Sequence, residues 1–413
     1  MIRRFLSLLG PGLLYAGAAI GVSHLVQSTR AGADFGFELM WIIFAANLLK
    51  FPFFEIGSRY VLATGKNLVD AYFDAGKWIL ALFLLLTLLT MFPIQAALTL
   101  VTAGLANNIT GLGLSSAQMS IVLVLLTMTL LILGRYKLLD NLIKYVIVAL
   151  TITTVLAVIS SLNIHPKHDG LESSFDWMNK KHIFFLIAFI GWMPAPIDIV
   201  VWTSLWSQTK FGKWEKKPAL KDVLIEFRVA YFGTMLIAAA FLALGALVMY
   251  GNNEALSPNG AVFAGQLIGM YTSTIGNWAY PVIATAALST MLSTTITVSD
   301  AYPRTLRHSV WLLFPPLRMK NERISYFFWI FILSAGVILL ITYSGSTMGF
   351  MVDMATSISF VTAPVLAFLN YKVITSSRIE KKYQPGIFLR IWSWIGIIFL
   401  SLFTFYYIYW LFT

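Results

Sequence analysis

Long apolar stretches alternate with short polar connections along nearly the whole chain. About twenty apolar residues cross a bilayer once as a helix, and eleven stretches reach or approach that length. These predicted segments 1 to 11 are residues 6–33, 37–62, 78–105, 118–134, 141–162, 183–206, 228–250, 278–300, 325–343, 350–373 and 388–412. The pattern predicts an all-α integral membrane protein with eleven transmembrane helices.

The composition agrees with this pattern and limits what else the chain can contain. Of the 413 residues, 58% are hydrophobic and 11% are charged, and the mean hydropathy is +0.79, far from the averages of soluble proteins. Eleven spans use about 220 residues, which leaves only connections. We therefore expect a single transmembrane domain over residues 1–413 and no enzyme activity, because the spans offer no paired carboxylates and no Ser-His-Asp spacing.

The basic residues predict the topology. Of 29 Lys and Arg residues, 23 fall in alternate connections on one side, three on the other side and three within spans. The positive-inside rule then places the N-terminus in the cytoplasm and the C-terminus outside. The first apolar stretch follows only Met1–Arg4 and is longer than a signal-peptide core, so we expect it to be retained. We expect a prokaryotic plasma (inner) membrane.

An odd number of spans with alternating basic loops suits two inverted repeats of five segments plus one extra helix. Segments 1 and 6 would then occupy corresponding positions, and both are interrupted. Segment 1 contains the small and polar stretch Gly17–His24, and segment 6 contains Gly191–Asp198 with two prolines. Broken backbone at mid-membrane is tolerated only where it faces protein or a water-filled cavity, so we predict a substrate site there; the alternative is a pair of packing kinks. The repeats would be residues 6–162 and 183–373, with the extra helix at 388–412.

Short motifs along the chain carry a family resemblance. They are Gly10–Leu14, Ala31–Phe37, Ala46–Leu49 with Arg59, Thr64–Leu68, Met193-Pro194 and Ser293–Thr297. Together they resemble the Nramp family of proton-coupled divalent metal transporters, and the match runs through most of the chain. The resemblance implies the LeuT-like fold of that family.

The residues at the family's metal site differ. Where the family has Asp-Pro-Gly-Asn in segment 1, this chain has Gly21–His24, and the position of the segment-6 histidine holds Ala195. Of the family's recognisable ligands only Met193 remains. A hard dication usually needs a carboxylate among several oxygen ligands, and one thioether with one imidazole would hold a transition metal poorly. We therefore expect none of the usual transition-metal site.

Without the carboxylate, the ends of the broken helices favour an anion. Half-helix N-termini each carry about half a positive charge, and Ser23 and His24 add hydrogen-bond donors. We predict cation-coupled uptake of a small anion such as bicarbonate. The predicted substrate site comprises Gly21, Ser23, His24, Met193 and Ala195, with helix packing as the alternative role of His24.

The alternative function is transport of a divalent metal ion, Mg²⁺ or Mn²⁺, with altered selectivity. In that case Asp198 or main-chain carbonyls would replace the missing carboxylate.

Hydroxyl groups in segment 8 predict a sodium site. Thr290, Ser293, Thr294 and Thr297 are spaced i, i+3, i+4 and i+7 and share a helix face. In LeuT-like symporters a sodium ion lies between this segment and the carbonyls of segment 1. The alternative is that these hydroxyls bond back to their own helix. Apart from a bound Na⁺, we expect no cofactor.

Ionisable residues within spans cost about 2.5–3.5 kcal/mol on insertion scales and so indicate function. Arg30 and Asp353 lie in the outward halves of segments 1 and 10. Neurotransmitter-type sodium symporters, which share the LeuT-like fold, close their outer gate with an Arg–Asp pair from these two segments, and this resemblance implies that Arg30 and Asp353 pair as an outer gate; the alternative is that each reaches the interface separately. Asp198 is expected to serve cation coupling, an inner gate or a static salt bridge. Glu55 and Arg59 are predicted to pair at i,i+4, and for Lys50 the sequence indicates no partner.

The remaining features restrict the partners. The chain has no cysteine and no phosphate-cradling glycine motif, so neither a thiolate site nor nucleotide-driven transport is expected. The basic stretch Lys213–Pro218 is explained by topology and anionic lipid rather than by nucleic acid. The mixture His165–Asp169 is typical of an ordinary loop. We expect a small inorganic ion and membrane lipid as partners, and a monomer.

Overall fold

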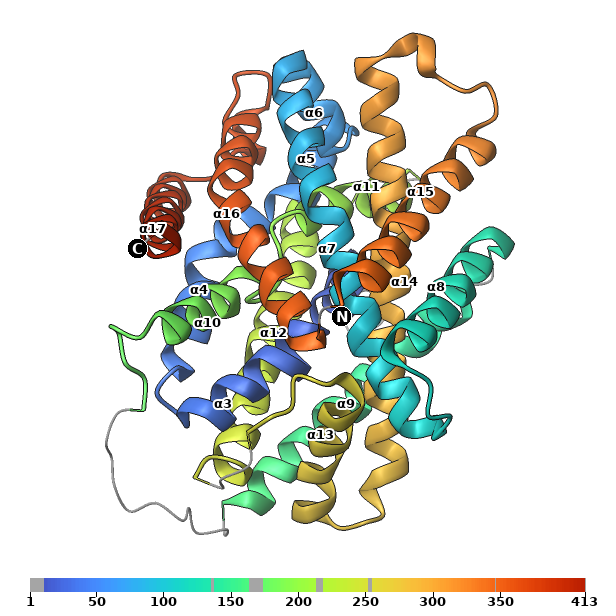
Figure 1. The fold of residues 1–413 in the computed structure, drawn as a ribbon. Coiled ribbons are helices and arrows are strands. Elements are labelled where there is room, and N and C mark those ends of the chain that lie inside the picture. The colour runs from blue at the N-terminus through green and yellow to red at the C-terminus, as the bar shows by residue number, and fades with distance from the viewer. Residues whose placement is uncertain are drawn as a thin grey trace.

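The computed structural model describes residues 11–134, 137–162, 174–212, 218–251, 255–345 and 347–412, and the regular elements among them are all helices (Figure 1). Segments 1 to 5 comprise α2 (Pro11–Ala19), the π-helix η1 (Ser23–Ser28), α3 (Thr29–Phe35), α4 (Met40–Phe54), α5 (Ile56–Thr64), α6 (Leu68–Ala75), α7 (Lys77–Thr110), α8 (Ser116–Leu133) and α9 (Lys137–Ser161). The rest comprises α10 (Lys180–Gly191), α11 (Ile199–Phe211), α12 (Leu220–Val248), α13 (Gly260–Ile275), α14 (Ala279–Leu313), the 3-10 turns η2 (Pro315–Leu317) and η3 (Lys381–Tyr383), α15 (Glu322–Ser344), α16 (Met348–Ile374) and α17 (Ile387–Phe412).

Apolar helices of membrane-spanning length dominate the described residues. Eight are long and apolar enough to cross a membrane: α4 with α5, and α7, α8, α12, α14, α15, α16 and α17. Predicted segments 1 and 6 are each divided into shorter helices, and segment 5 is α9. The peripheral α17 exposes Ile391, Ile398 and Leu402, each more than half accessible, as a lipid-facing helix requires. The prediction of an all-α integral membrane protein is confirmed.

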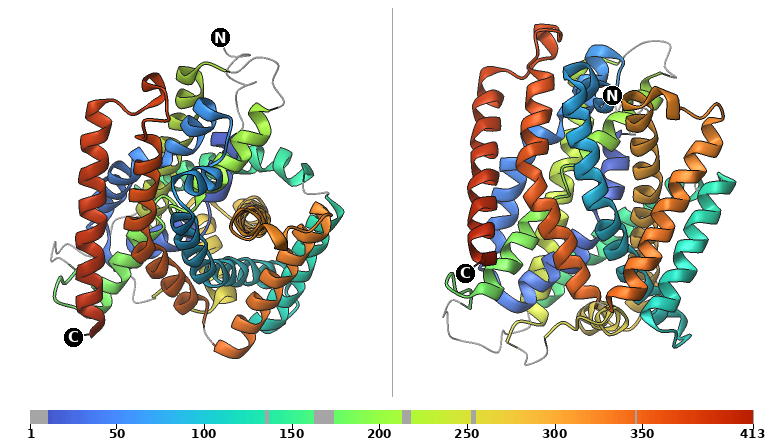
Figure 2. Two further views of the ribbon diagram at one scale, coloured as in Figure 1. Left: turned by 90° about the horizontal axis from the view of Figure 1, so that it is seen from above. Right: turned by 45° about the horizontal axis from the view of Figure 1, so that its top comes forward.

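The centre of the molecule is the pair α7 and α14, which pack on each other more extensively than any other two helices of the described chain (Figure 2). Around this pair the same partnerships occur in both halves. Segment 1 packs through α3 on α12, and segment 6 packs through α11 on α5; α7 contacts α16 and α8, and α14 correspondingly contacts α9 and α15. Two inverted repeats of five segments require such partnerships, although the expected boundaries 6–162 and 183–373 stay predictions. α17 lies at one edge of the molecule, against α4 and α16.

The two ends of the bundle differ in charge. The connections that follow α5, α14 and α16 lie at one end (Figure 1), which we call the basic end because these connections carry Lys66, Arg318 and Arg378. The helix α13 and the start of α16 lie at the opposite end, as the right-hand view of Figure 2 shows.

Several helices depart from the predicted spans, among them α6 (Leu68–Ala75), which lies in a predicted connection. The structure adds α13, in a connection for which no helix was predicted, where the Asn259 side chain caps its first turn through the backbone N–H groups of Ala261 and Val262. It also extends α14 to Leu313, well past the predicted end at residue 300. The apolar pattern fades there because the helix leaves the apolar layer. Its last turns carry charged groups with partners, among them His308, whose Nε2 lies 2.7 Å from Asp70 Oδ1.

A close helix crossing ties segment 1 to the bundle. A Cβ atom built on Gly32 of α3 would lie 2.0 Å from the carbonyl oxygen of Leu242 in α12, and one built on Gly245 would lie 2.4 Å from the carbonyl oxygen of Thr29. Both distances are far below van der Waals contact, so the two backbones can approach only because both positions are glycine.

We therefore expect Gly32→Ala to destabilise the protein by about 1–3 kcal/mol, as overpacking of a close contact does. The matched control is Gly233→Ala in α12, where nothing lies within 4 Å of the added Cβ and helix propensity favours alanine by about 1 kcal/mol. The measurement is the temperature at which detergent-solubilised protein loses its monodisperse elution peak. Equal melting of the two variants would contradict the assignment of this crossing.

Candidate functional site

Segments 1 and 6 are both interrupted at mid-molecule. In segment 1, α2 ends at Ala19, and after Ile20 and Gly21 the chain re-enters helical structure, with η1 from Ser23. The interruption is thus shorter than the predicted Gly17–His24, because the small residues before Ile20 remain helical. In segment 6, α10 ends at Gly191 and α11 begins at Ile199, and the prolines between them cannot donate a backbone hydrogen bond.

A cavity of about 20 Å³ lies between the two interruptions. Such a volume holds about one or two water-sized groups. Its wall is formed by Ala18, Ala19, Val22 and Ser23 of segment 1, Ile94 and Leu98 of α7, Trp192, Ala195, Pro196, Ile199 and Trp202 of segment 6, and Thr294 and Val298 of α14. The polar side chains among these are two hydroxyls and two indoles, and none of the lining side chains is ionisable. We call this space the central cavity.

The five predicted substrate residues lie in different places relative to this cavity. Ser23 and Ala195 line it, whereas Gly21, His24 and Met193 do not. A Cβ atom built on Gly21 would lie 3.2 Å from both Cγ2 and Oγ1 of Thr294. The position at which the family carries its metal-binding aspartate is therefore packed against α14 here.

His24 faces α12 instead of the central cavity. Its Nε2 lies 3.1 Å from the carbonyl oxygen of Thr234, and its Nδ1 lies 2.7 Å from the Ser23 hydroxyl. A carbonyl only accepts, so Nε2 carries a proton, and in the neutral tautomer Nδ1 accepts from Ser23. The Ser23 oxygen also lies 3.2 Å from the carbonyl oxygen of Pro194. His24 thus orients Ser23, which bridges the two interruptions.

The predicted sodium residues meet segment 1 through Thr294. Its hydroxyl oxygen lies 3.1 Å from the carbonyl oxygen of Gly17 and 3.3 Å from that of Ile20. The Thr290 hydroxyl is fully buried and has no hydrogen-bond partner among the described residues. The Thr294 hydroxyl also lies 3.1 Å from the carbonyl oxygen of Thr290 in its own helix, as the alternative requires, so its one proton faces three acceptors and the sodium site stays a prediction. In the described chain, neither Ser293 nor Thr297 hydrogen-bonds to segment 1.

The predicted gate residues lie together at the end opposite the basic end. Arg30 Nη1 lies 2.7 Å from Asp353 Oδ1 and its Nη2 lies 3.3 Å from Oδ2, a two-pronged ion pair between α3 and α16. Gln27 donates to the same carboxylate at 3.0 Å, and the guanidinium stacks 5.1 Å from the centre of the Phe185 ring. Three helices therefore meet at this pair, while its role as a gate stays a prediction.

Asp198 precedes α11 and is 5% exposed. Its Oδ2 accepts a hydrogen bond of 3.1 Å from Thr90 in α7. Among the described residues Asp198 has no ion-pair partner, so the static salt bridge considered for it stays without support there. The roles in coupling or in an inner gate stay predictions.

Sequence reasoning missed the partners of Lys50. The Lys50 side chain is completely buried, and its Nζ donates to the carbonyl oxygens of Ile190 at 2.6 Å and Gly191 at 3.0 Å. These carbonyls are accessible because α10 ends at this point. No pattern of side chains in the sequence indicates that these two carbonyl groups are the partners of Lys50.

Charged groups also close the basic end around segment 1. The predicted pair Glu55–Arg59 is confirmed, and the same buried carboxylate accepts from Arg228 of α12 at 3.0 Å. Both carboxylate oxygens of Glu226 lie 3.1 Å from the backbone N–H of Gly12, at the start of α2. These contacts join α2, α5 and α12.

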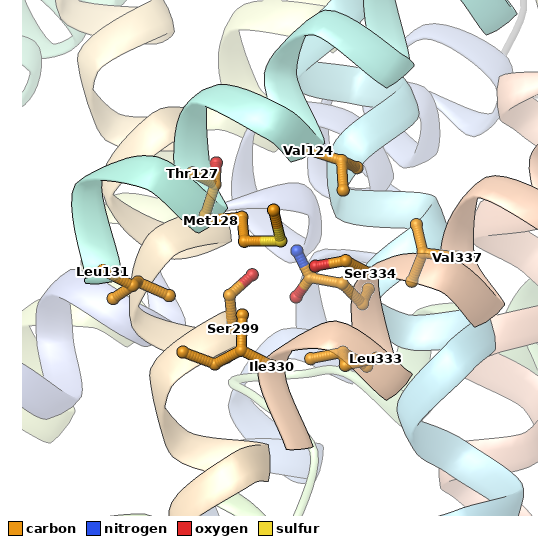
Figure 3. Close-up of a pocket in the computed structure, with 10 residues that line it drawn as sticks. Val124, Thr127, Met128, Leu131, Ser299, Ile330, Leu333, Ser334 and Val337 are labelled. Carbon is orange, nitrogen blue, oxygen red and sulfur yellow. The ribbon is translucent and has the colours of Figure 1, made fainter. Parts of the chain in front are cut away.

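A second cavity, of about 10 Å³, lies on the far side of the central helix pair, between α7, α8, α14 and α15 (Figure 3). Its wall combines apolar side chains with the hydroxyls of Thr127, Ser299 and Ser334 and the amide of Gln95. Gln95 and Ser299 directly follow Ile94 and Val298 of the central cavity in sequence, so α7 and α14 separate the two spaces. Only the central cavity touches both interruptions.

Two stretches discussed from the sequence, Met1–Arg4 and His165–Asp169, lie outside the described residues, as does most of Lys213–Pro218. In the part of the chain that the structure describes, no group of three or more His, Asp or Glu residues is placed to hold a metal ion.

Comparisons with known sequences give a consistent result. A family model described as natural resistance-associated macrophage protein-like (Nramp) matches residues 12–410. An uncharacterized protein of Pasteurella multocida is 37% identical over 406 residues, covering 96% of this chain and 90% of the relative. The metal transporter NRAT1 of Oryza sativa is 23% identical over 410 residues, covering 95% of this chain and 72% of the relative.

Comparisons with solved structures show the fold. A manganese transporter of Eremococcus coleocola superposes with a TM-score of 0.69 at 15% identity, covering 97% of this chain and 86% of that chain. MhsT in complex with L-phenylalanine superposes with a TM-score of 0.65 at 14% identity, covering 97% and 98%.

If Arg30–Asp353 closes the cavity, Arg30→Gln should open it toward that end. The chain has no cysteine, so Ala195→Cys supplies a single thiol in the wall of the central cavity. A half-exposed ion pair contributes about 1 kcal/mol, and we expect labelling by an impermeant maleimide to be about fivefold faster when Arg30→Gln is added. Lys66→Gln, which breaks the exposed Lys66–Asp74 pair at the basic end, is the control. Equal labelling in all three proteins would refute the gate.

Proposed function

Because this chain belongs to the Nramp family and has a LeuT-like fold, we propose that the ion it carries through the central cavity is a small anion such as bicarbonate, taken up together with Na⁺. The chain is an integral membrane secondary transporter. Its family transports small inorganic ions, and the proposal concerns only which ion and which coupling.

The observation that carries the proposal is the uncharged wall of the central cavity. Every lining side chain is apolar, a hydroxyl or an indole, and the family's aspartate and histidine positions are Gly21 and Ala195. A dication in this wall would find no carboxylate. The first residue of α11, Ile199, lines the cavity, so the positive end of that half-helix is near it, although the carboxylate of Asp198 at the same end opposes that positive charge.

The second candidate is a divalent metal ion, and the comparisons favour it. The relatives include proteins named as a metal transporter and as a manganese transporter. Met193, the thioether of the family's ligand set, is retained within the interruption of segment 6. This candidate needs Asp198 to exchange its bond with Thr90 for a place in the cavity, where Mg²⁺ or Mn²⁺ would keep part of its water shell.

The coupling ion is proposed to be Na⁺ at Thr294. The carbonyl oxygens of Gly17 and Ile20 converge on the Thr294 hydroxyl, with the unpartnered Thr290 hydroxyl one turn away on the same helix. Neutral oxygens of this kind suit a monovalent cation. A cation that binds beside an anion also offsets its charge in a low-dielectric interior.

The topology proposed is the one the basic connections indicate. The basic end would face the cytoplasm of a prokaryotic cell. Arg30–Asp353 would then close the outer side, and the contacts of Glu55 and Glu226 would close the inner side. A monomer suffices, because both interruptions and the cavity belong to one chain.

Replacement of Gly21 distinguishes the two candidate substrates. Gly21→Ala adds only the Cβ that meets Thr294, whereas Gly21→Asp also adds the family's carboxylate. A charge about 4 Å away at an effective dielectric of about 20 contributes roughly 4 kcal/mol. We therefore expect Gly21→Asp to weaken bicarbonate uptake by about two to three orders of magnitude relative to Gly21→Ala.

The measurement is uptake of ¹⁴C-bicarbonate and of Mn²⁺ and Mg²⁺ into proteoliposomes. Saturable Mn²⁺ or Mg²⁺ uptake by the unmodified protein at micromolar concentration, without bicarbonate uptake, would establish the second candidate and refute the first.

The sodium proposal predicts that Thr294→Ala raises the Na⁺ concentration needed for half-maximal uptake by about tenfold, as expected for loss of one polar ligand. Thr305→Ala is the matched control, since the Thr305 hydroxyl bonds only to the carbonyl of Ala301 in its own helix. Uptake that is unchanged when choline replaces Na⁺ under a pH gradient would assign the coupling to protons instead.

A further inference from the structure

Lys50 is a fully buried ammonium group in the middle of a membrane helix. It is 0% exposed, and its two hydrogen bonds go to the carbonyl oxygens of Ile190 and Gly191. No carboxylate of the described residues lies within ion-pair distance of it. Removing such a group from water costs several kcal/mol, so an unpaired intramembrane lysine indicates a function.

The position of Lys50 connects it to the central cavity. Gly191 is the last residue of α10, and the next residue, Trp192, lines the cavity. The carbonyl end of a helix carries about half a negative charge, which favours the charged form of Lys50. With Lys50 in its ammonium form, the α10 side of the interruption has a net positive charge.

The other buried charge at this interruption is Asp198, on the α11 side, bonded to Thr90. Lys50 and Asp198 thus offset each other across segment 6, while His24, in its neutral tautomer, adds no charge. The charges of a transported monovalent anion and a sodium ion also cancel. If Lys50 lost its charge, Asp198 would be left as the uncompensated charge beside the cavity, and the site would favour cations.

We propose that Lys50 is the residue that sets the charge selectivity of the central cavity: its ammonium, held by the carbonyls of Ile190 and Gly191, favours a small anion and disfavours a cation. Lys50 acts as a positioning residue at a distance, since it does not line the cavity. The proposal rests on the proposed function in taking the central cavity as the substrate site. Whichever ion the protein carries, Lys50 should raise the affinity of the cavity for an anion and lower its affinity for a cation.

Three substitutions separate charge from hydrogen bonding. Lys50→Gln keeps a donor without charge, Lys50→Met removes both, and Lys50→Arg keeps the charge. The probes are ¹⁴C-bicarbonate and Mn²⁺, measured as half-saturating concentrations in proteoliposomes. A unit charge at an effective dielectric of about 20 contributes on the order of 1–2 kcal/mol over about 8–16 Å, so both neutral variants should need on the order of tenfold more bicarbonate. Both should also take up Mn²⁺ better than the unmodified protein, and Lys50→Arg should resemble the unmodified protein.

The control is Ser359→Ala, which removes the hydrogen bond of 2.8 Å from Trp192 Nε1 and so loosens the same interruption without changing charge. We expect it to alter uptake of both ions by the same small factor. A neutral variant that keeps its bicarbonate affinity, or one that loses uptake of both ions alike, would overturn the proposal. If both neutral variants fail to fold while Lys50→Arg is stable, the charge is structural and the proposal is wrong.

The uptake measurements distinguish failure of the proposed function from failure of the Lys50 proposal. If the unmodified protein carries Mn²⁺ and no bicarbonate, the anion proposal fails, yet the Lys50 proposal still requires Lys50→Gln and Lys50→Met to carry Mn²⁺ with higher affinity. An unchanged or lower affinity for Mn²⁺ would then overturn it as well.

Discussion

Backbone groups freed by a broken helix inside a membrane must find partners within the protein, because lipid offers none. This constraint explains the arrangement at the centre of the molecule. The last carbonyl groups of α10 accept hydrogen bonds from Lys50. The carbonyl oxygens of Gly17 and Ile20, at the interruption of segment 1, lie within hydrogen-bond distance of the Thr294 hydroxyl. The carbonyl oxygen of Pro194 lies 3.2 Å from the Ser23 hydroxyl oxygen. Each of these side chains comes from a different segment, so the interruptions hold the helices of both halves together.

The same partners define the chemistry of the central cavity. Its wall is uncharged, while a positive group is bonded at one end of α10 and a carboxylate lies at the start of α11. Selectivity in such a site depends on the field of groups that do not touch the ion, since the low dielectric of the interior lets that field act over several ångströms. The ion pair Arg30–Asp353 joins segment 1 to α16, and the pair Glu55–Arg228 joins segment 2 to α12; in the proposed transport cycle these two pairs control access from the two sides.

Much of the fold could be predicted from the sequence, because apolar runs, alternating basic connections and paired Gly and Pro interruptions are local signals. The chain's resemblance to a known family supplied the pairing of Arg30 with Asp353. The end of α14 was missed because its charged last turns resemble a loop. His24 was assigned to the substrate, yet its ring nitrogens bond to Thr234 and Ser23. Lys50 had no predicted partner because its acceptors are backbone atoms 140 and 141 residues away, available only where α10 ends. Such contacts depend on tertiary structure and leave no pattern in the sequence.

The central claim is that the cavity between the two interruptions, having no carboxylate in its wall, binds a small anion together with a sodium ion. Isothermal titration calorimetry on the purified protein tests it most directly, with bicarbonate titrated in NaCl and in choline chloride, and with Mn²⁺ and Mg²⁺ titrated separately. The account predicts saturable one-to-one binding of bicarbonate that requires Na⁺, and no specific heat for either metal. Saturable one-to-one binding of Mn²⁺ or Mg²⁺, with no heat from bicarbonate in either salt, would contradict it.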